Sequence, residues 1–211
     1  MLIRPATSGD LAACLALDES YTTNHVWQIE ARSDEEAITV SFRPIRLPRP
    51  LTVQPADVEA RRQEAWPRCH CILVATEGPD EAPARLTTRN GGDLPSRLTP
   101  RNGGRDGKSG RAGASEVRGI LTLMARPWPR TGWIEDLVVA PAHRRQGVGR
   151  ALLGEARRWA QRQGLSALLA QASTQNYPAI CFYQECGFTF CGFHEHYYPN
   201  RDIALFFVAP V

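Results

Sequence analysis

The chain lacks the features that would place it in a membrane or outside the cell. Its 211 residues contain no apolar run long enough, about 18 residues, for a transmembrane helix. The opening Met1-Leu2-Ile3-Arg4-Pro5 does not follow the basic-then-apolar design of a secretory signal peptide. We therefore expect a cytoplasmic protein with a single domain over residues 1–211, a length sufficient for a hydrophobic core.

Cysteines are too few to form a disulfide scaffold: the chain has six. Cys69-His70-Cys71 contains metal-ligating residue types. However, C-x-C is not the usual zinc-knuckle spacing, and alternate residues of a strand merely share a face. We expect no metal cofactor and interpret Cys181, Cys186 and Cys191 as small core residues.

Large apolar residues are nearly absent from residues 77–115. Arg85–Gly92 recurs as Arg97–Gly104 with one difference, and residues 78–115 hold seven basic and four acidic side chains, which accounts for the net charge of +3. Such a segment buries too little surface to offset its ordering entropy. We predict a disordered loop insertion at 77–115. It has no aromatic residue to stack on a base, so no nucleic-acid partner is expected.

A phosphate-binding loop is predicted at Arg144-Arg145-Gln146-Gly147-Val148-Gly149-Arg150, between an apolar strand (133–139) and an amphipathic helix (148–163). The glycines allow backbone N–H groups to approach an anion, and the helix dipole and the arginines add positive charge. The loop lacks the third glycine of a dinucleotide fingerprint, where Leu152 stands, and no Gly-Lys-Ser/Thr of a P-loop follows.

The spacing that fits is Arg-x-x-Gly-x-Gly directly after strand 134–139 and Pro141. It resembles the acetyl-CoA-binding motif of the GNAT N-acetyltransferase superfamily. A second stretch, 176–188, is similar to the segment that closes the CoA site in that superfamily. Here Asn176 is a good helix N-cap and Gly187 a good helix stop. Between the two motifs there is room for one helix and one strand of a βαβ crossover.

The resemblance implies an α/β (α+β) fold: a central mixed, mostly antiparallel sheet flanked by helices, with a V-shaped splay at the acetyl-CoA site. Acetyl-CoA would be the co-substrate, bound by residues 144–150, Asn176 and Tyr183 and by the strand Leu137, Val138 and Val139, whose N–H groups would form an oxyanion hole. Tyr183 occupies the position of the general acid. Members of the superfamily are often dimers, and the sequence identifies no interface.

The general base remains open between Glu135 and Asp136, which as neighbours on a strand should face opposite sides. Regular alternation would place Asp136 with Ile134 and Val138, and Glu135 with Trp133, Leu137 and Val139. Carboxylates in an apolar strand are costly unless paired, which hints at function. We favour Glu135 and hold Asp136 second, with His194 and His196 as outside candidates.

The expected reaction is transfer of an acetyl group from acetyl-CoA to a primary amine of a small molecule or peptide, by direct attack in a ternary complex. The second half of the chain most resembles streptothricin-type acetyltransferases. The alternatives are an N-terminal acetyltransferase of the ribosomal-protein type and a non-catalytic acyl-CoA-binding sensor.

The remaining pattern predicts the other elements. We expect strands at 2–4, 69–76, 117–125, 165–172, 190–194 and 203–208, and helices from Ser8 or Asp10 to about 18 and at 55–66. Residues 25–32 and 37–47 predict a hairpin turning at 33–36, which would either cover the sheet or form a wall of the acceptor pocket.

Overall fold

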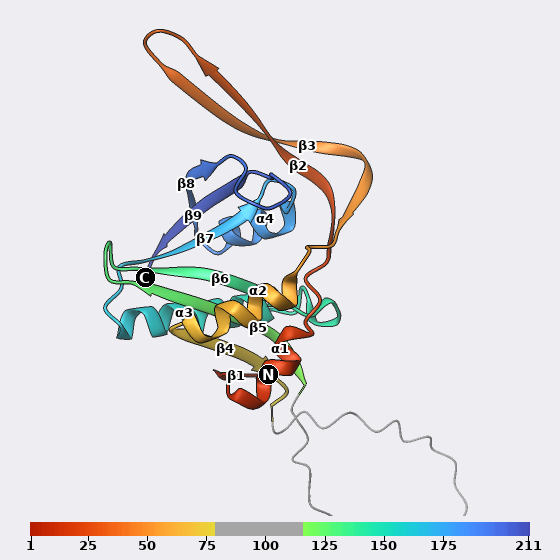
Figure 1. Ribbon diagram of the computed structural model, residues 1–211, viewed down its shortest axis with the longest axis vertical. Coiled ribbons are helices and arrows are strands. Elements are labelled where there is room, and N and C mark those ends of the chain that lie inside the picture. Colours follow the sequence, from red (N-terminus) through yellow and green to blue (C-terminus); the bar gives the residue numbers. More distant parts are fainter. Residues whose placement is uncertain (79–115) are drawn as a thin grey trace, which may run out of the picture.

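The computed structural model describes residues 1–78 and 116–211, so all but the first two residues of the insertion predicted at 77–115 lie outside the described residues. A seven-stranded sheet runs in the order β1-β4-β5-β6-β7-β9-β8 (Figure 1). Only the β6–β7 pair is parallel. The strands are β1 (Leu2–Pro5), β4 (Cys71–Thr76), β5 (Val117–Arg126), β6 (Thr131–Val139), β7 (Ala167–Ser173), β8 (Thr189–His194) and β9 (Ala204–Pro210). The predicted mixed, mostly antiparallel sheet is confirmed.

Helices cover both faces of this sheet. On one face, α1 (Leu11–Leu15) and α2 (Val58–Ala65) lie over a small core that includes Cys14, Val74 and Ile120. On the other, α3 (Val148–Arg162) buries Leu152 and Ala156 in the main core. Helix α4 (Tyr177–Glu185) follows β7, and three 3₁₀ turns lie at Ser8–Asp10, Trp66–Arg68 and Pro141–His143. None of the helices in 1–78 and 116–211 has the length and apolarity to span a bilayer.

Helix α1 is shorter than predicted: it ends at Leu15 instead of continuing to residue 18. The physical reason lies in α2, where Arg62 Nη1 donates hydrogen bonds to the carbonyl oxygens of Cys14 (2.8 Å) and Leu17 (3.1 Å). An arginine from elsewhere in the chain therefore satisfies carbonyls that a longer helix would have used internally. The chain is freed to continue as the irregular segment 16–20.

The predicted hairpin is present and longer than expected, with β2 (Tyr21–Ser33) paired to β3 (Ile38–Val53). At the turn, the carboxylate of Asp34 accepts hydrogen bonds from the N–H groups of Glu36 and Ala37. The tip rises away from the sheet (Figure 1). The base packs on α4 and β8, where His25 stacks on Tyr177 and Phe42 meets Phe190.

Candidate active site

Strands β6 and β7 separate partway along their length. Their pairing covers only 131–133 against 167–169, although both strands continue to Val139 and Ser173. The N–H of Asp136 points to β5, where it donates to Thr122 Oγ1 (3.0 Å). Because N–H directions alternate along a strand, those of Leu137 and Val139 face the open side of the splay. Of the three residues expected to supply oxyanion-hole donors, Leu137 and Val139 therefore have their N–H groups on this side, whereas the N–H of Val138 points to β5 like that of Asp136.

The loop after β6 ends at the N-terminus of α3. Gly147 is the N-cap, with φ +83°, and Arg145 also has a positive φ, +62°. The first intrahelical bond that reaches Gly147 comes from the N–H of Ala151. The N–H groups of Val148, Gly149 and Arg150 therefore have no partner within the helix and point outward from its positive end. This arrangement suits a pyrophosphate.

Gly149 is required for a second reason, the close approach of α3 to α4. A Cβ at this position would lie 3.2 Å from Cε2 of Phe182 and 3.7 Å from Cγ2 of Val139. Any side chain here would enter the narrow space between β6, α3 and α4. The loop and the splay thus meet where β6 ends and α3 begins, and the outward N–H groups present there fit an acyl-CoA.

Arg144 forms structural hydrogen bonds that the motif did not predict. Its Nε donates to the carbonyl oxygen of Val139 (2.9 Å), Nη1 to that of Ser20 (2.7 Å) and Nη2 to that of Asp18 (3.0 Å). The guanidinium thereby joins the end of β6 to the segment after α1. The side chain of Gln146 donates a hydrogen bond to the carbonyl oxygen of Ala142. Arg145 and Arg150 are exposed, and Arg150 forms an ion pair with Glu185.

Asn176 is the N-cap of α4, as predicted: its Oδ1 accepts a hydrogen bond from the N–H of Ala179 (3.1 Å). Replacing Asn176 with alanine is expected to lower the free energy of unfolding by about 1 kcal/mol, because that N–H loses its side-chain acceptor and keeps only the backbone carbonyl of residue 176. Thermal unfolding measures the effect. Asn176→Asp keeps an acceptor oxygen and is the control; equal destabilisation by both substitutions would contradict a capping role.

A β-bulge at Glu135 breaks the expected alternation on β6. Asp136 pairs with Thr122 but Ile134 pairs with Leu123, which leaves Glu135 as an extra residue. Ile134 therefore packs in the core under α3, while Asp136 faces α2. The prediction that Ile134 and Asp136 share a face was wrong, because the sequence pattern contains no sign of the extra residue.

Asp136 belongs to a buried cluster of four charges. Its Oδ1 lies 2.8 Å from Arg61 Nη1, and its Oδ2 lies 3.5 Å from Arg62 Nε. Glu19 completes the cluster, paired with both arginines. Burial and the charge of Asp136 raise the pKa of Glu19. Two carboxylates and two guanidiniums balance in formal charge, so the carboxylate of Asp136 is already engaged in ion pairs.

Glu135 is half-buried and differently placed. Among residues 1–78 and 116–211, no cation forms an ion pair with its carboxylate. Burial, and then the negative charge of Asp136, raise the pKa of Glu135, partly opposed by Arg126 and Arg68. A carboxylate with a raised pKa, two residues before Leu137 on the same strand, has the properties of a general base.

Tyr183 is buried in an aromatic cluster with Phe182, Phe188 and Phe207. Burial first, and then the charge of Asp136, hold the pKa of its phenol well above the usual range. The phenol therefore stays protonated at neutral pH, the form that a proton donor needs. The same shift makes Tyr183 a weaker acid than a free phenol, so hydrogen-bond donation to a departing thiolate suits it better than full proton transfer.

Sequence reasoning missed three further tyrosines in this region. Burial raises the pKa of Tyr21 to about 12 and also raises those of Tyr197 and Tyr198. Two of them also feel charges of the site, Glu135 acting on Tyr197 and Arg61 on Tyr198. The sequence around the Tyr197-Tyr198 pair did not predict that this loop lies near the splay.

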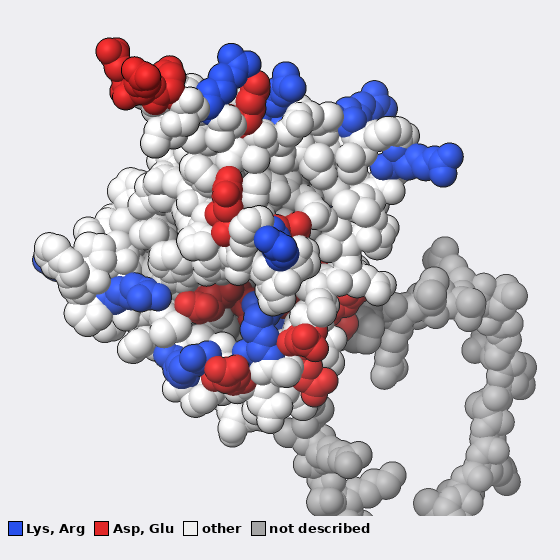
Figure 2. All heavy atoms as spheres, turned by 45° about the horizontal axis from the view of Figure 1, so that its top comes forward, with Lys and Arg blue, Asp and Glu red and all other residues white. Residues whose placement is uncertain are grey.

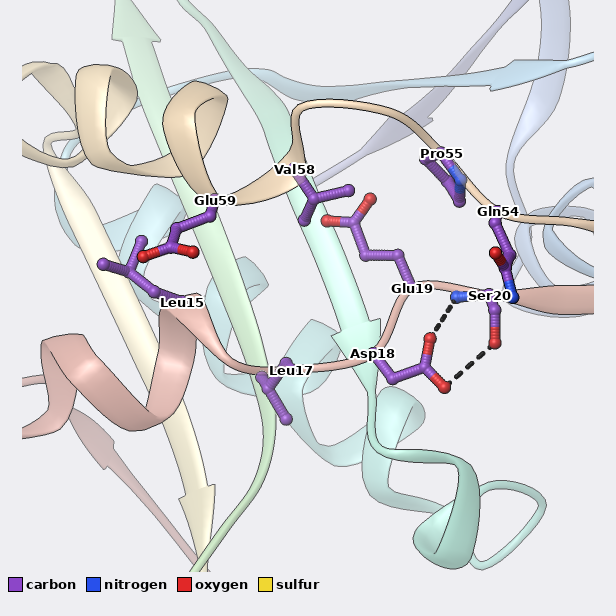
Figure 3. A pocket seen from close by; sticks show the side chains of 9 residues that line it. All are labelled: Leu15, Leu17, Asp18, Glu19, Ser20, Gln54, Pro55, Val58 and Glu59. Atoms are coloured by element: carbon purple, nitrogen blue, oxygen red, sulfur yellow. Dashed lines mark hydrogen bonds between the residues drawn. The ribbon is translucent and has the colours of Figure 1, made fainter.

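A cleft of about 280 Å³ lies beside the charge cluster, between the segments 15–20 and 54–59 (Figure 3). Asp18, Glu19 and Glu59 contribute carboxylates to its lining, and the carboxylate of Asp18 accepts hydrogen bonds from the N–H and hydroxyl of Ser20. No basic side chain lines it among the described residues. On the face seen in Figure 2, acidic and basic side chains are interspersed, without an extended surface of one sign among the residues drawn in colour.

Among the other candidates from the sequence, the ring of His194 lies 5.6 Å from the ring of Tyr197, measured between centroids. His194 and His196 are exposed at the end of β8. Cys181 and Cys186 are partly buried, but the prediction of a core position for Cys191 was wrong, because it is exposed. His70 accepts a hydrogen bond from the N–H of Ala125 (3.3 Å) at its Nδ1, and Cys71 is in the core.

Comparison with known proteins agrees with this geometry. The model of the Acetyltransferase (GNAT) family matches residues 107–188. Streptothricin acetyltransferase of Streptomyces lavendulae is 29% identical over 197 residues, which cover 93% of this chain and 86% of that protein.

Solved structures extend the match. The crystal structure of nourseothricin acetyltransferase superposes with a TM-score of 0.70 at 27% identity, over 99% of this chain and 97% of that one. A Bacillus anthracis protein in complex with acetyl coenzyme A shares the fold, with a TM-score of 0.67 at 19% identity, over 100% and 98%. Residues 107–188 thus match the GNAT family, the chain is similar in sequence and fold to these acetyltransferases over nearly its whole length, and it acts as an acetyl-CoA-dependent N-acetyltransferase.

Proposed function

We propose that the protein acetylates an amine of a cationic small molecule of the streptothricin type. The observation that carries the proposal is the match to streptothricin acetyltransferase along 93% of the chain, which includes segments 19–66 that the GNAT motifs leave undefined. The carboxylates and tyrosines around the splay support it, since a cationic acceptor is attracted by negative charge and by aromatic faces.

In this proposal each group has one role. Bound acetyl-CoA supplies the thioester whose acetyl group is transferred. The N–H groups of Leu137 and Val139 polarise the thioester oxygen, a contribution worth about 3 kcal/mol per donor. Glu135 takes a proton from the acceptor ammonium, and Tyr183 donates a hydrogen bond to the departing thiolate. The amine attacks directly, so no acyl-enzyme forms.

The test is to incubate the protein with acetyl-CoA and streptothricin and to follow thiol release, with mass spectrometry of the product. Transfer of one acetyl group to streptothricin is expected. The comparison substrate is a peptide with an N-terminal alanine. Acetylation of the peptide without acetylation of streptothricin would contradict the proposed acceptor and favour an N-terminal acetyltransferase.

Co-substrate binding is tested separately by calorimetric titration with acetyl-CoA. We expect Gly149→Glu to abolish binding, because its carboxylate would lie in the space between β6 and the start of α3 where the phosphates approach. Gly149→Gln is the size-matched control, since it crowds Phe182 equally but adds no charge. Equal loss in the two variants would assign the effect to crowding, and undiminished binding by Gly149→Glu would contradict the proposed phosphate site.

A further inference from the structure

The two arginines of the charge cluster are held very differently. Arg62 is 2% exposed, and it donates to the carbonyl oxygens of Cys14 and Leu17 as well as pairing with Glu19. Arg61 is 48% exposed. Within the described part of the chain, its guanidinium donates only to carboxylates, those of Asp136 and Glu19. Arg62 is therefore held by backbone carbonyls as well as by an ion pair, whereas Arg61 is held only by ion pairs at the surface of the cluster.

The carboxylates that Arg61 covers lie next to the reaction centre. Asp136 directly precedes Leu137, whose N–H faces the splay. An acceptor amine that reaches a thioester held there comes close to Asp136. Arg61 also acts electrostatically on Tyr198. An incoming ammonium would therefore meet a cluster that is already neutral, with a guanidinium at its outer side.

A third cation gains little from a balanced cluster, because it is repelled by both arginines as much as it is attracted by both carboxylates. If Arg61 moves out, two carboxylates face one fixed cation, and the net charge of the site becomes −1. Half-exposed ion pairs are weak enough to exchange, whereas Arg62 is held by backbone carbonyls and stays. Asp136 and Glu19 are then never left without a buried counter-ion.

We propose that Arg61 is a specificity-determining residue: it occupies, in the free enzyme, the cation site formed by Asp136 and Glu19, and a cationic acceptor binds by displacing it. The inference rests on the proposed function for the identity of the acceptor, but not for the existence of the site. Neutral amines and acceptors without a second positive charge gain no binding free energy from the exchange. The displacement of Arg61 therefore favours cationic acceptors.

The site itself is tested without turnover. Methylguanidinium chloride at millimolar concentration should raise the melting temperature of Arg61→Ala above its value in equal sodium chloride, because the ion refills the vacated position. The wild-type protein should show no such difference. The control is Arg68→Ala, which removes an exposed arginine paired with Glu64 just after α2 and leaves the cluster intact. Equal shifts in all three proteins, or none in Arg61→Ala, would overturn the proposal.

Kinetics test the exchange with an acceptor. We expect Arg61→Ala to lower KM for streptothricin about fivefold, since the acceptor no longer competes with a half-exposed ion pair. KM for acetyl-CoA should not change, and methylguanidinium should inhibit the variant competitively against streptothricin. An unchanged or higher KM for streptothricin would overturn the proposal. If Arg61→Ala does not fold, Arg61→Gln takes its place in both experiments.

The two experiments fail independently. If streptothricin is not a substrate of the wild-type enzyme, the proposed function is wrong, while the methylguanidinium shift still reports whether Asp136 and Glu19 form a cation site that Arg61 fills. If streptothricin is acetylated but the shift is absent, the function stands and the role of Arg61 is refuted.

Discussion

Replacing Tyr183 with phenylalanine is expected to lower kcat about 100-fold, because the departing thiolate loses its hydrogen-bond donor. The affinity for acetyl-CoA should stay close to that of the wild type. The ring keeps its packing against Phe182, Phe188 and Phe207, so the fold should be preserved. Thiol-release kinetics give kcat, and calorimetry gives the affinity.

Tyr177→Phe is the matched control for this experiment. Tyr177 lies on the same helix but stacks on His25, outside the aromatic cluster of Tyr183. Removal of its hydroxyl should leave kcat nearly unchanged. An undiminished rate in Tyr183→Phe would remove Tyr183 from the mechanism, and equal losses in both variants would indicate a general effect on α4.

Glu135→Gln is expected to lower kcat/KM about 100-fold at neutral pH, because the amide cannot accept the acceptor's proton. The wild-type enzyme should also lose activity as the pH falls. The pKa of Glu135 is raised, so protonation of the carboxylate begins at a higher pH than for an ordinary glutamate and removes the base. The residual activity of Glu135→Gln should lack this acidic limb, which pH–rate profiles of both proteins would reveal.

Asp136→Asn distinguishes the two carboxylates. Asp136 neutralises the buried charge of Arg62 and also pairs with the half-exposed Arg61, so its loss should destabilise the fold by about 3–5 kcal/mol, the usual effect of removing one partner of a buried ion pair. Glu135 has no ion-pair partner among the described residues, and Glu135→Gln should change the melting temperature little. A stable but inactive Asp136→Asn, together with an active Glu135→Gln, would reverse the two roles.

The parts of the site that depend on local sequence could be predicted. The glycine loop at the start of α3, the cap at Asn176 and the crossover β6–α3–β7 all appear where the pattern indicated. Each depends on residues a few positions apart: a glycine with positive φ, a side-chain oxygen three residues before an N–H, and an apolar stripe at helical spacing. Such signals act within one element and need no knowledge of the fold.

Hydrogen-bonding partners distant in the chain could not be predicted. Arg61 meets Asp136 across 75 positions, and Arg144 reaches the carbonyl of Asp18 across 126. The sequence suggested that carboxylates on β6 need counter-charges, but the charge-rich pattern of α2 resembled an ordinary solvated face. Only the fold brings α2 over β6 and buries Arg62.

The bulge at Glu135 is the clearest case of a feature decided by tertiary structure. By itself, the sequence determined that β6 carries two carboxylates and leads into a phosphate loop. It could not determine which carboxylate is paired, because one extra residue in a strand leaves no mark on the hydrophobic pattern yet changes the face of the residues on either side. The bulged pairing of β6 with β5 decides this: it directs Asp136 to the arginines of α2. Glu135 is left without an ion pair within the described residues.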